Sequence, residues 1–431
     1  MSEPSARVSA TVVNERSANG TTSYAIAFDL LNDIKVDIPG PFGPGTIGEI
    51  ESDLLDIALS VHFLERDQRK KAFTNRVRQI DARLPVRRPE FWELNRDRIV
   101  ELLRFMGGCD WSISFVSSSV PVRTAAAVVE APARSVALNS GGMDSTCGLA
   151  SLVADVKDIR LASFYTLNSK IQRSLADKLG FESPSRMRAV WKDRSERRGN
   201  GALSYRSFLF LTFGAIVAKS FQAGQLLQFE NGVMARAVPP AASYFTTRHA
   251  HPKTHRLFNE LLAAADIDVK VENPFMSMTK GQEVEACRTK LSSKTDDLLK
   301  QTDSCWYFHY QRVPVRYGPG TISKEPRRHC GICVPCLVRR AAFGDGNYVF
   351  DPMRPPKAAT GAQSDQRNFT YNLDALRGFS HIALDTTNGP EFRRALSRNG
   401  IDVDQETGSW SDLQQLYSRF AREFLSRFPE K

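Results

Sequence analysis

The fold of this chain is decided by one short stretch, Ser135-Val136-Ala137-Leu138-Asn139-Ser140-Gly141-Gly142-Met143-Asp144-Ser145. It begins with a short apolar run, Val136-Ala137-Leu138, which is typical of a buried strand. Two glycines follow, and the residues from Ser145 to Val153 have the pattern of a helix. A second apolar strand is predicted at Ile159–Leu167. The order strand, loop, helix, strand predicts a parallel α/β sheet.

The glycine loop has the chemistry of an anion-binding site. Gly141 and Gly142 let the backbone approach an anion closely, and the N–H groups and dipole of the next helix attract negative charge. Asp144 is placed to hold Mg²⁺, directly or through water. No lysine lies in the loop, so it is not the Gly-Lys-Ser/Thr phosphate loop. The hydroxyl donors of the stretch are Ser140, Ser145 and Thr146. An ordinary strand-to-helix turn is the alternative interpretation.

A cysteine run predicts a metal site. Cys330, Cys333 and Cys336 are spaced Cys-x2-Cys-x2-Cys, and zinc needs four such ligands on a turning backbone. Cys305 is the expected fourth ligand. His329 competes with it, but its position beside Cys330 strains joint coordination. Four cysteines would also suit an iron–sulfur cluster; a closed structural zinc site, with no open position for catalysis, is our interpretation.

The composition describes a folded, basic protein. The chain has 431 residues, 42% of them hydrophobic and 25% charged, with a net charge of +10. This charge fits nucleic acid or another polyanion as well as a mixed solvated surface. The first ten residues lack a secretory signal, and the apolar run Phe208–Ala218 is too short to span a membrane. We therefore expect a cytoplasmic protein.

Three regions are predicted. Residues 1–120 form an α+β module, with strands at Ala6–Asn14, Thr21–Leu31 and Trp111–Val116, an ambiguous apolar segment at Leu54–Phe63 and a helix at Pro89–Met106. Linkers at Pro121–Arg134 and Pro352–Ser364 separate it from a central domain, 135–350, and a helical C-terminal extension, 365–431.

The last predicted helix has an apolar stripe, which indicates packing. Ser411 and Gln414 would form its capping box. The stripe consists of Leu413, Leu416, Tyr417, Phe420, Phe424 and Phe428.

The glycine loop and the cysteine run together resemble the QueC family of PP-loop ATP pyrophosphatases, the 7-cyano-7-deazaguanine synthases. The similarity extends over about 135–343. Further motifs that carry it are Arg206-Ser207-Phe208-Leu209-Phe210-Leu211, Asn273-Pro274-Phe275 with Thr279-Lys280, Ser304-Cys305-Trp306 and Cys330-Gly331-Ile332-Cys333-Val334-Pro335-Cys336-Leu337.

The resemblance implies a set of site residues. Asp144, Arg206 and Lys280 would be catalytic. The ATP-binding residues would be Ser140, Gly141, Gly142, Asp144, Ser145 and Thr146. The zinc ligands would be Cys305, Cys330, Cys333 and Cys336. ATP and Mg²⁺ would activate 7-carboxy-7-deazaguanine as an acyl-adenylate with release of pyrophosphate, and ammonia would attack it.

The sequence also departs from the family. The segment Thr166-Leu167-Asn168-Ser169-Lys170 lacks the family's Tyr-Gly-Gln-x-His. In place of its Tyr-Pro-Asp-Cys-Arg segment are Glu230-Asn231-Gly232 and Thr247-Arg248-His249-Ala250-His251-Pro252. With extensions at both ends, the chain resembles the enlarged QatC branch of anti-phage Qat systems. That resemblance implies an amine of a partner protein as acceptor, docked on the N-terminal module. His249, His251 and His255 are candidate bases. A tRNA-modifying PP-loop enzyme and a non-catalytic scaffold are the competing hypotheses.

Overall fold

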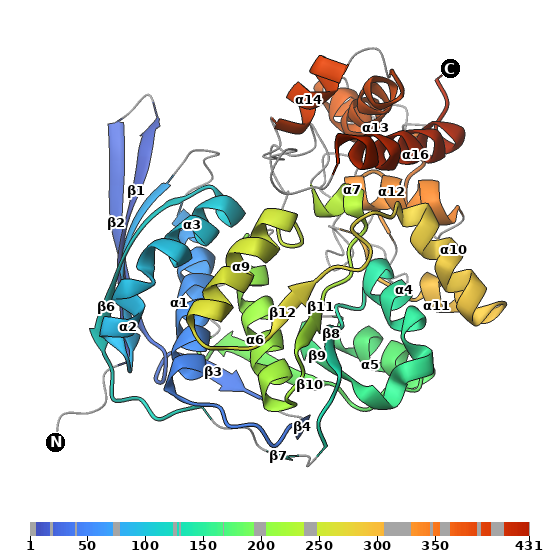
Figure 1. Ribbon diagram of the computed structural model, residues 1–431. Helices are drawn as coiled ribbons and strands as arrows, with labels where there is room; N and C mark the ends of the chain where they lie inside the picture. Colours follow the sequence, from blue (N-terminus) through green and yellow to red (C-terminus); the bar gives the residue numbers. More distant parts are fainter. Residues whose placement is uncertain are drawn as a thin grey trace.

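The computed structural model describes most of the chain (Figure 1). The described residues are 6–17, 20–38, 41–71, 78–123, 127–128, 131–166, 168–193, 204–236, 248–305, 329–344, 348–353, 363–385, 389–397 and 409–430. Parts of both predicted linkers lie outside these ranges.

An N-terminal sheet has the strand order β2-β1-β5-β6. Burial alternates along β6, where Trp111, Ile113 and Phe115 are buried and Ser112 and Ser114 are exposed, so one face packs against the core. The three strands predicted in this region are confirmed. The strands are β1 (Arg7–Ser17), β2 (Gly20–Asp29), β5 (Arg78–Val86) and β6 (Asp110–Ser117).

Helices cover the buried face of this sheet. The ambiguous segment Leu54–Phe63 lies within a long helix, α1 (Glu49–Lys71). The single helix predicted at Pro89–Met106 is wrong at Asn95, whose backbone (φ −104°, ψ 5°) separates α2 (Pro89–Leu94) from α3 (Arg96–Gly107). Gly108 ends α3 in the left-handed conformation, φ +67°, which a residue without Cβ adopts easily.

The central sheet has the order β12-β11-β8-β9-β10-β3. The pairs β12–β11, β11–β8, β8–β9 and β9–β10 are parallel, which confirms the predicted parallel α/β sheet. Strand β3, from the N-terminal region, pairs antiparallel with β10. The strands are β3 (Ile34–Asp37), β8 (Ser135–Leu138), β9 (Ile159–Phe164), β10 (Ser185–Trp191), β11 (Gln225–Leu227) and β12 (Lys270–Glu272). A separate pair joins β4 (Pro41–Phe42) to β7 (Ala127–Val128).

Alternate residues of the central strands enter two different cores. Val136 belongs to the core that includes residues of α1 and α6, whereas the next residue, Ala137, belongs to the core that includes residues of α4 and α5. The sheet is therefore covered on both faces, as parallel sheets require (Figure 1). The predicted buried helix at 208–218 is confirmed as α6 (Arg206–Ser220). The other helices around the sheet are α4 (Met143–Ser151), the 3-10 helix η1 (Val153–Asp158), α5 (Ser169–Lys178), α7 (Gly232–Ala235), α9 (Pro252–Ala264), α10 (Lys280–Leu291), α11 (Lys294–Lys300) and α12 (Val334–Phe343).

The C-terminal region is helical, as predicted, with α13 (Gln363–Leu384), α14 (Gly389–Ser397) and α16 (Trp410–Arg427). The whole predicted stripe of the last helix is buried in one cluster with α12 and α13. The predicted capping box is wrong, because α16 begins two residues earlier than expected. Ser409 is its N-cap and accepts a hydrogen bond from the Asp412 N–H. Among the described helices, none has the length and apolarity that a membrane crossing needs.

Candidate active site and metal centre

The glycine loop joins the buried strand β8 to α4. Gly141 has φ +77°, and a Cβ there would lie 3.2 Å from Gln172 Cγ. Gly142 is the N-cap of α4 and offers no side chain to the helix start. Helix α4 begins at Met143, two residues before the predicted start, so Asp144 lies in its first turn. The N–H groups of that turn are directed toward the loop, as in anion sites at helix N-termini.

The hydroxyl groups of the loop are partly engaged within it. Ser140 Oγ is 3.0 Å from Ser145 Oγ, and the Thr146 hydroxyl donates to the Gly142 carbonyl at 2.8 Å. Ser140 is exposed, whereas Ser145 and Thr146 are buried. The Ser140 hydroxyl also accepts the Gly142 N–H at 3.2 Å, so all three hydroxyls support the loop and the helix start. Their roles in binding ATP stay a prediction.

Three residues that the sequence analysis missed support the loop. Asn139 Oδ1 accepts the Gly141 N–H at 3.3 Å, and its Nδ2 donates to the Gln172 carbonyl at 3.0 Å. Gln172 Nε2 donates to the carbonyls of Ser140 and Phe164, each at 3.3 Å. The Gly141 carbonyl accepts the Asp303 N–H at 3.0 Å. A polar residue directly after a buried strand was the available signal for Asn139; Gln172 and Asp303 reach the loop only through the tertiary fold.

Asp144 and Lys280 form a buried ion pair, although they are far apart in sequence. Lys280 is the first residue of α10 and Asp144 lies on α4, two helices that pack together. Burial alone would raise the pKa of Asp144, but the charge of Lys280 and hydrogen bonds lower it overall. Burial opposes protonation of Lys280, yet the Asp144 charge raises its pKa. Both groups are thus charged at neutral pH.

Asn231 donates hydrogen bonds to the second oxygen of the Asp144 carboxylate. Its backbone N–H and its Nδ2 donate to Asp144 Oδ1 at 3.2 and 2.9 Å. Asn231 follows β11 and caps α7, where its side chain accepts from the Met234 N–H. Both oxygens of Asp144 are therefore engaged, one by Asn231 and the other by Lys280. A cation held by Asp144 would have to share it with these partners.

Two further carboxyl groups, Glu230 and Glu283, surround this pair. Burial and the charge of Asp144 raise the pKa of both. Glu230 Oε2 lies 3.3 Å from His249 Nε2. The carboxyl oxygens of Glu283 are buried, and its side chain lies beside the Asp144 carboxylate. The sequence analysis quoted Glu230 only as a departure from the family and did not identify Glu283.

Of the remaining candidates, Arg206, His251 and His255 lie outside this cluster. Arg206 is exposed at the start of α6, and its guanidinium lies 5.5 Å from the Phe210 ring. His251 accepts the Lys253 N–H as N-cap of α9, and His255 Nε2 is 2.8 Å from Gln228 Oε1. Burial lowers the pKa of both histidines to about 3, so both are neutral at pH 7. Of the three histidines proposed as bases, the structure brings His249 to the cluster, through Glu230.

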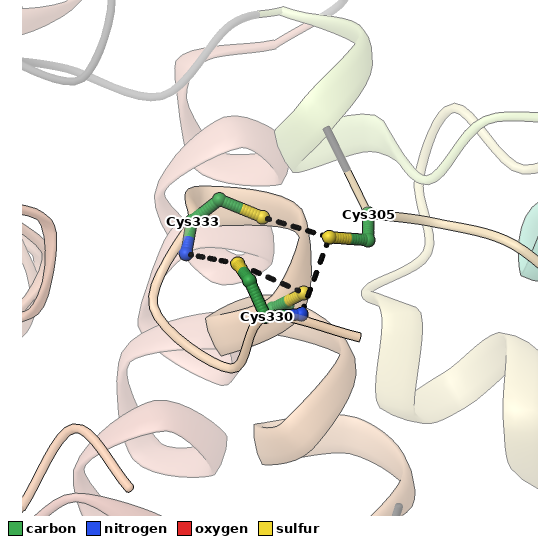
Figure 2. A group of neighbouring side chains, drawn as sticks. Cys305, Cys330 and Cys333 are labelled. Atoms are coloured by element: carbon green, nitrogen blue, oxygen red, sulfur yellow. Dashed lines mark hydrogen bonds between the residues drawn. The ribbon is translucent and has the colours of Figure 1, made fainter. Parts of the chain in front are cut away.

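Four cysteines form a compact cluster, as predicted, and Figure 2 shows three of them, Cys305, Cys330 and Cys333. Cys305, Cys330, Cys333 and Cys336 are all buried, and their sulfurs lie within 4.8 Å of one another. The Cys330–Cys336 and Cys305–Cys333 sulfur distances are 3.8 and 4.0 Å. Tetrahedral zinc with bonds of about 2.3 Å places its sulfurs about 3.8 Å apart, so the cluster fits this ion. His329 is not in the group.

Backbone geometry supports the thiolates. The N–H groups of Cys330 and Cys333 lie 3.3 Å from the sulfurs of Cys305 and Cys330, respectively. Gly331 has φ +85°, and a Cβ there would lie 2.3 Å from the Phe350 carbonyl oxygen. Only glycine can therefore form the turn between the first two ligands of the run.

Comparison with known proteins finds a family match for part of the chain. Residues 192–347 match the family of queuosine biosynthesis protein QueC, so the chain contains a QueC-like domain. The matched segment includes Arg206, Lys280 and all four cysteines, and it begins after the glycine loop. No curated protein matches the chain. The match indicates a QueC-like, ATP-using enzyme of the 7-cyano-7-deazaguanine synthase type, and an ATP-dependent ligase by class.

Proposed function

We propose that the chain is an ATP-dependent carbon–nitrogen ligase that adenylylates the carboxylate of 7-carboxy-7-deazaguanine and transfers the acyl group to an amine. The observation that carries the proposal is the buried ion pair between Asp144, in the first turn of α4, and Lys280, the first residue of α10, beside a loop that suits ATP. The QueC match of residues 192–347 supports the substrate class.

The first step activates the carboxylate. One of its oxygens attacks the α-phosphorus of ATP, and the bond from that phosphorus to the bridging oxygen breaks. Pyrophosphate leaves with the electron pair and an acyl-adenylate remains. Lys280 and the N–H groups of the loop are suited to stabilise the negative charge of the leaving group, and Arg206 is a further candidate through the family resemblance. Mg²⁺ supplies further positive charge when it is bound; Asp144 and Glu230 are the carboxylates of the cluster that could hold it.

The second step forms the carbon–nitrogen bond. A neutral amine attacks the acyl carbon, and AMP leaves with the electrons of the carbon–oxygen bond. The nitrogen must then lose a proton. The Glu230–His249 pair is suited to accept it, because the two side chains are 3.3 Å apart and Glu230 belongs to the cluster around Asp144.

The metal centre supports the loop in this proposal and takes no part in the reaction. Cys305 follows Asp303 and Ser304 directly. The Asp303 N–H donates to the Gly141 carbonyl, and Ser304 Oγ accepts the Met143 N–H at 3.4 Å. Zinc bound by Cys305 would hold this segment against the glycine loop.

We further propose that the acceptor is an amine of a partner protein in anti-phage defence. Departures from the QueC pattern at Asn168 and Glu230 support a changed acceptor. The module of residues 1–120 would dock the partner beside the ligase domain, 135–350, and the extension 365–431 would support α10 and α12. An ordinary 7-cyano-7-deazaguanine synthase, which uses ammonia, is the second candidate, favoured by the QueC match itself.

Pyrophosphate release tests the activation step. With ATP, Mg²⁺ and 7-carboxy-7-deazaguanine we expect release that depends on the substrate. Asp144→Asn should abolish it, and Asp97→Asn, at a highly exposed carboxylate on α3, should leave it unchanged. No substrate-dependent release, or equal release by both variants, contradicts the proposal.

Mass spectrometry then identifies the acceptor. With ammonia as the only amine, the nitrile would appear as a small-molecule product if the enzyme is an ordinary synthase. With a co-expressed partner protein, a deazaguanine adduct on that protein is expected. Pyrophosphate release followed by a nitrile alone would reject the protein acceptor and retain the ligase.

A further inference from the structure

A group of arginines surrounds an exposed tyrosine at the end of β9. Tyr165 is 46% exposed. The guanidinium carbons of Arg186 and Arg188 lie 5.5 and 5.0 Å from the centre of its ring. Both arginines are on β10 and point to the same face of that strand, since alternate residues share a face. Arg173, on α5, completes what we call the arginine patch: Tyr165, Arg173, Arg186 and Arg188.

Among the described residues, the positive charges of the patch have no counter-ion. In the described part of the chain, none of its arginines forms an ion pair with a carboxylate. Asp37 lies opposite Arg188 in the register of β3 and β10, but its carboxylate pairs with Lys35 at 3.5 Å. Burial, and after it the charge of Arg173, lowers the pKa of Arg186. Three like charges thus lie together, and the described part of the chain supplies no carboxylate that neutralises them.

Donor groups in the patch are also unsatisfied. Nε and Nη2 of Arg186 and Nε of Arg188 are buried and make no hydrogen bond to any described residue. A buried donor without an acceptor costs free energy. An oxyanion would accept these hydrogen bonds and neutralise the charge, and the planar guanidinium is well matched to phosphate.

The patch adjoins the glycine loop through one side chain. Gln172 Nε2 donates both to the Ser140 carbonyl of the loop and to the Phe164 carbonyl, one residue before Tyr165. Arg173 is the next residue of α5. The patch is nevertheless separate from the Asp144–Lys280 cluster, since it lies on β9, β10 and α5 rather than on α4 and α10.

We propose that the arginine patch is a second binding site, for a nucleotide-type ligand whose phosphate contacts Arg186 and Arg188 and whose base stacks on Tyr165. Aromatic rings next to arginines bind bases and phosphates in this way in many proteins that bind single strands. The phosphate could belong to a single-stranded nucleic acid or to a free mononucleotide. Both share the chemistry of the site, and the experiment distinguishes them.

Binding to two probes tests the proposal. The first is a fluorescein-labelled single-stranded RNA of twelve uridines, followed by fluorescence anisotropy; the second is UMP, followed by calorimetry. The test variant is Arg186→Gln/Arg188→Gln. Its matched control is Arg98→Gln/Arg422→Gln, which removes the same charge from two exposed arginines on α3 and α16. Circular dichroism and thermal unfolding establish that both variants are folded.

We expect at least a tenfold weaker Kd in the test variant and an unchanged Kd in the control. For RNA, the slope of log K against log salt should fall by about 1.4, since two phosphate contacts are lost at about 0.7 each. Tyr165→Ala should weaken binding without changing the salt slope. RNA binding with these properties identifies nucleic acid as the source of the phosphate, and UMP binding alone identifies a mononucleotide. Binding of neither probe, or equal weakening in both double variants, overturns the proposal.

Discussion

Lys280 and Asp144 are buried together, so each charge depends on the other for its stability. Removing one partner leaves an uncompensated charge, which costs about 3–5 kcal/mol in buried pairs. We therefore expect Lys280→Gln to lower the free energy of unfolding by that amount and to reduce pyrophosphate release by more than a hundredfold. Urea unfolding and a pyrophosphate assay measure the two effects. Lys290→Gln, on the exposed face of the same helix, should do neither.

A double variant separates stability from catalysis. Asp144→Asn/Lys280→Gln removes both charges and should recover much of the lost stability, because no buried charge remains unpaired. Its activity should stay low. Recovery of pyrophosphate release in the double variant would contradict a role for the pair in the reaction.

Glu283 makes stability depend on pH. Its folded-state pKa is raised, by burial first and then by Asp144. Below the unfolded pKa of about 4.3 the carboxyl group is protonated in both states. As the pH rises above that value, the unfolded chain loses its proton and the folded protein retains it. The stability contributed by the protonated form is therefore lost progressively, by up to about 1.4 kcal/mol per pH unit, until the folded pKa is passed.

Glu283→Gln should remove this dependence. We expect the variant to gain stability over the natural chain at pH 8 and to gain much less at pH 5, as measured by urea unfolding at the two pH values. Glu285→Gln, two residues away and exposed, provides the control. An equal difference at both pH values would show that Glu283 is ionised in the folded protein.

At the level of single elements, the local motifs could be predicted from the sequence, but the residues at which helices begin and break could not. The glycine loop and the cysteine run are each contiguous, so their chemistry can be read from neighbouring residues. Ser409 displaced Ser411 as the N-cap of α16 because both are good capping residues and packing decides which begins the helix. Asn95 likewise interrupts a helix whose apolar pattern continues across it.

The turn at Gly331 can be tested with a matched glycine. Gly331→Ala would place a Cβ 2.3 Å from the Phe350 carbonyl oxygen and should abolish retention of zinc on gel filtration, measured by metal analysis. Gly344 has nearly the same φ, +82°, but a Cβ there meets nothing within 4 Å. Gly344→Ala thus adds backbone strain alone and should retain zinc. Loss of zinc from both variants would point to backbone strain rather than the clash.

The start of α10 is held from two sides. Thr279 and Gln282 form a capping box, and the Thr279 hydroxyl also donates to Glu423 on α16. Thr279→Val should lower the free energy of unfolding by about 1 kcal/mol or more and weaken activity, since Lys280 is the next residue. Thr289→Val, exposed on the same helix, is the control. Unchanged stability and activity in Thr279→Val would contradict the idea that the C-terminal extension supports the site through the Thr279–Glu423 hydrogen bond.

At the level of the whole molecule, the candidate site depends on contacts that sequence order conceals. Asp144, Asn231 and Lys280 come from three separate segments, and no local pattern predicts that they meet. The pairing of β3 with β10 is similarly non-local, and it ties the N-terminal region into the central sheet. The sequence could therefore predict the type of sheet, the metal ligands and two of these three residues: Asp144 from the chemistry of the loop, and Lys280 through the family resemblance. Asn231 and Glu283 required the fold.

The metal centre and the glycine loop are connected through Asp303 and Ser304, and this connection gives the last prediction. Cys305→Ser should lower zinc content and, because its two neighbours bond to Gly141 and Met143, should also raise the Kd for ATP, measured by calorimetry. Cys109→Ser, outside the cluster, should change neither.

A purely remote zinc site would lose metal and stability while the folded fraction kept its affinity for ATP. Measuring that affinity below the unfolding transition separates the two cases: a raised Kd in the folded variant means that zinc positions the loop, and an unchanged Kd means that it stabilises only its own segment.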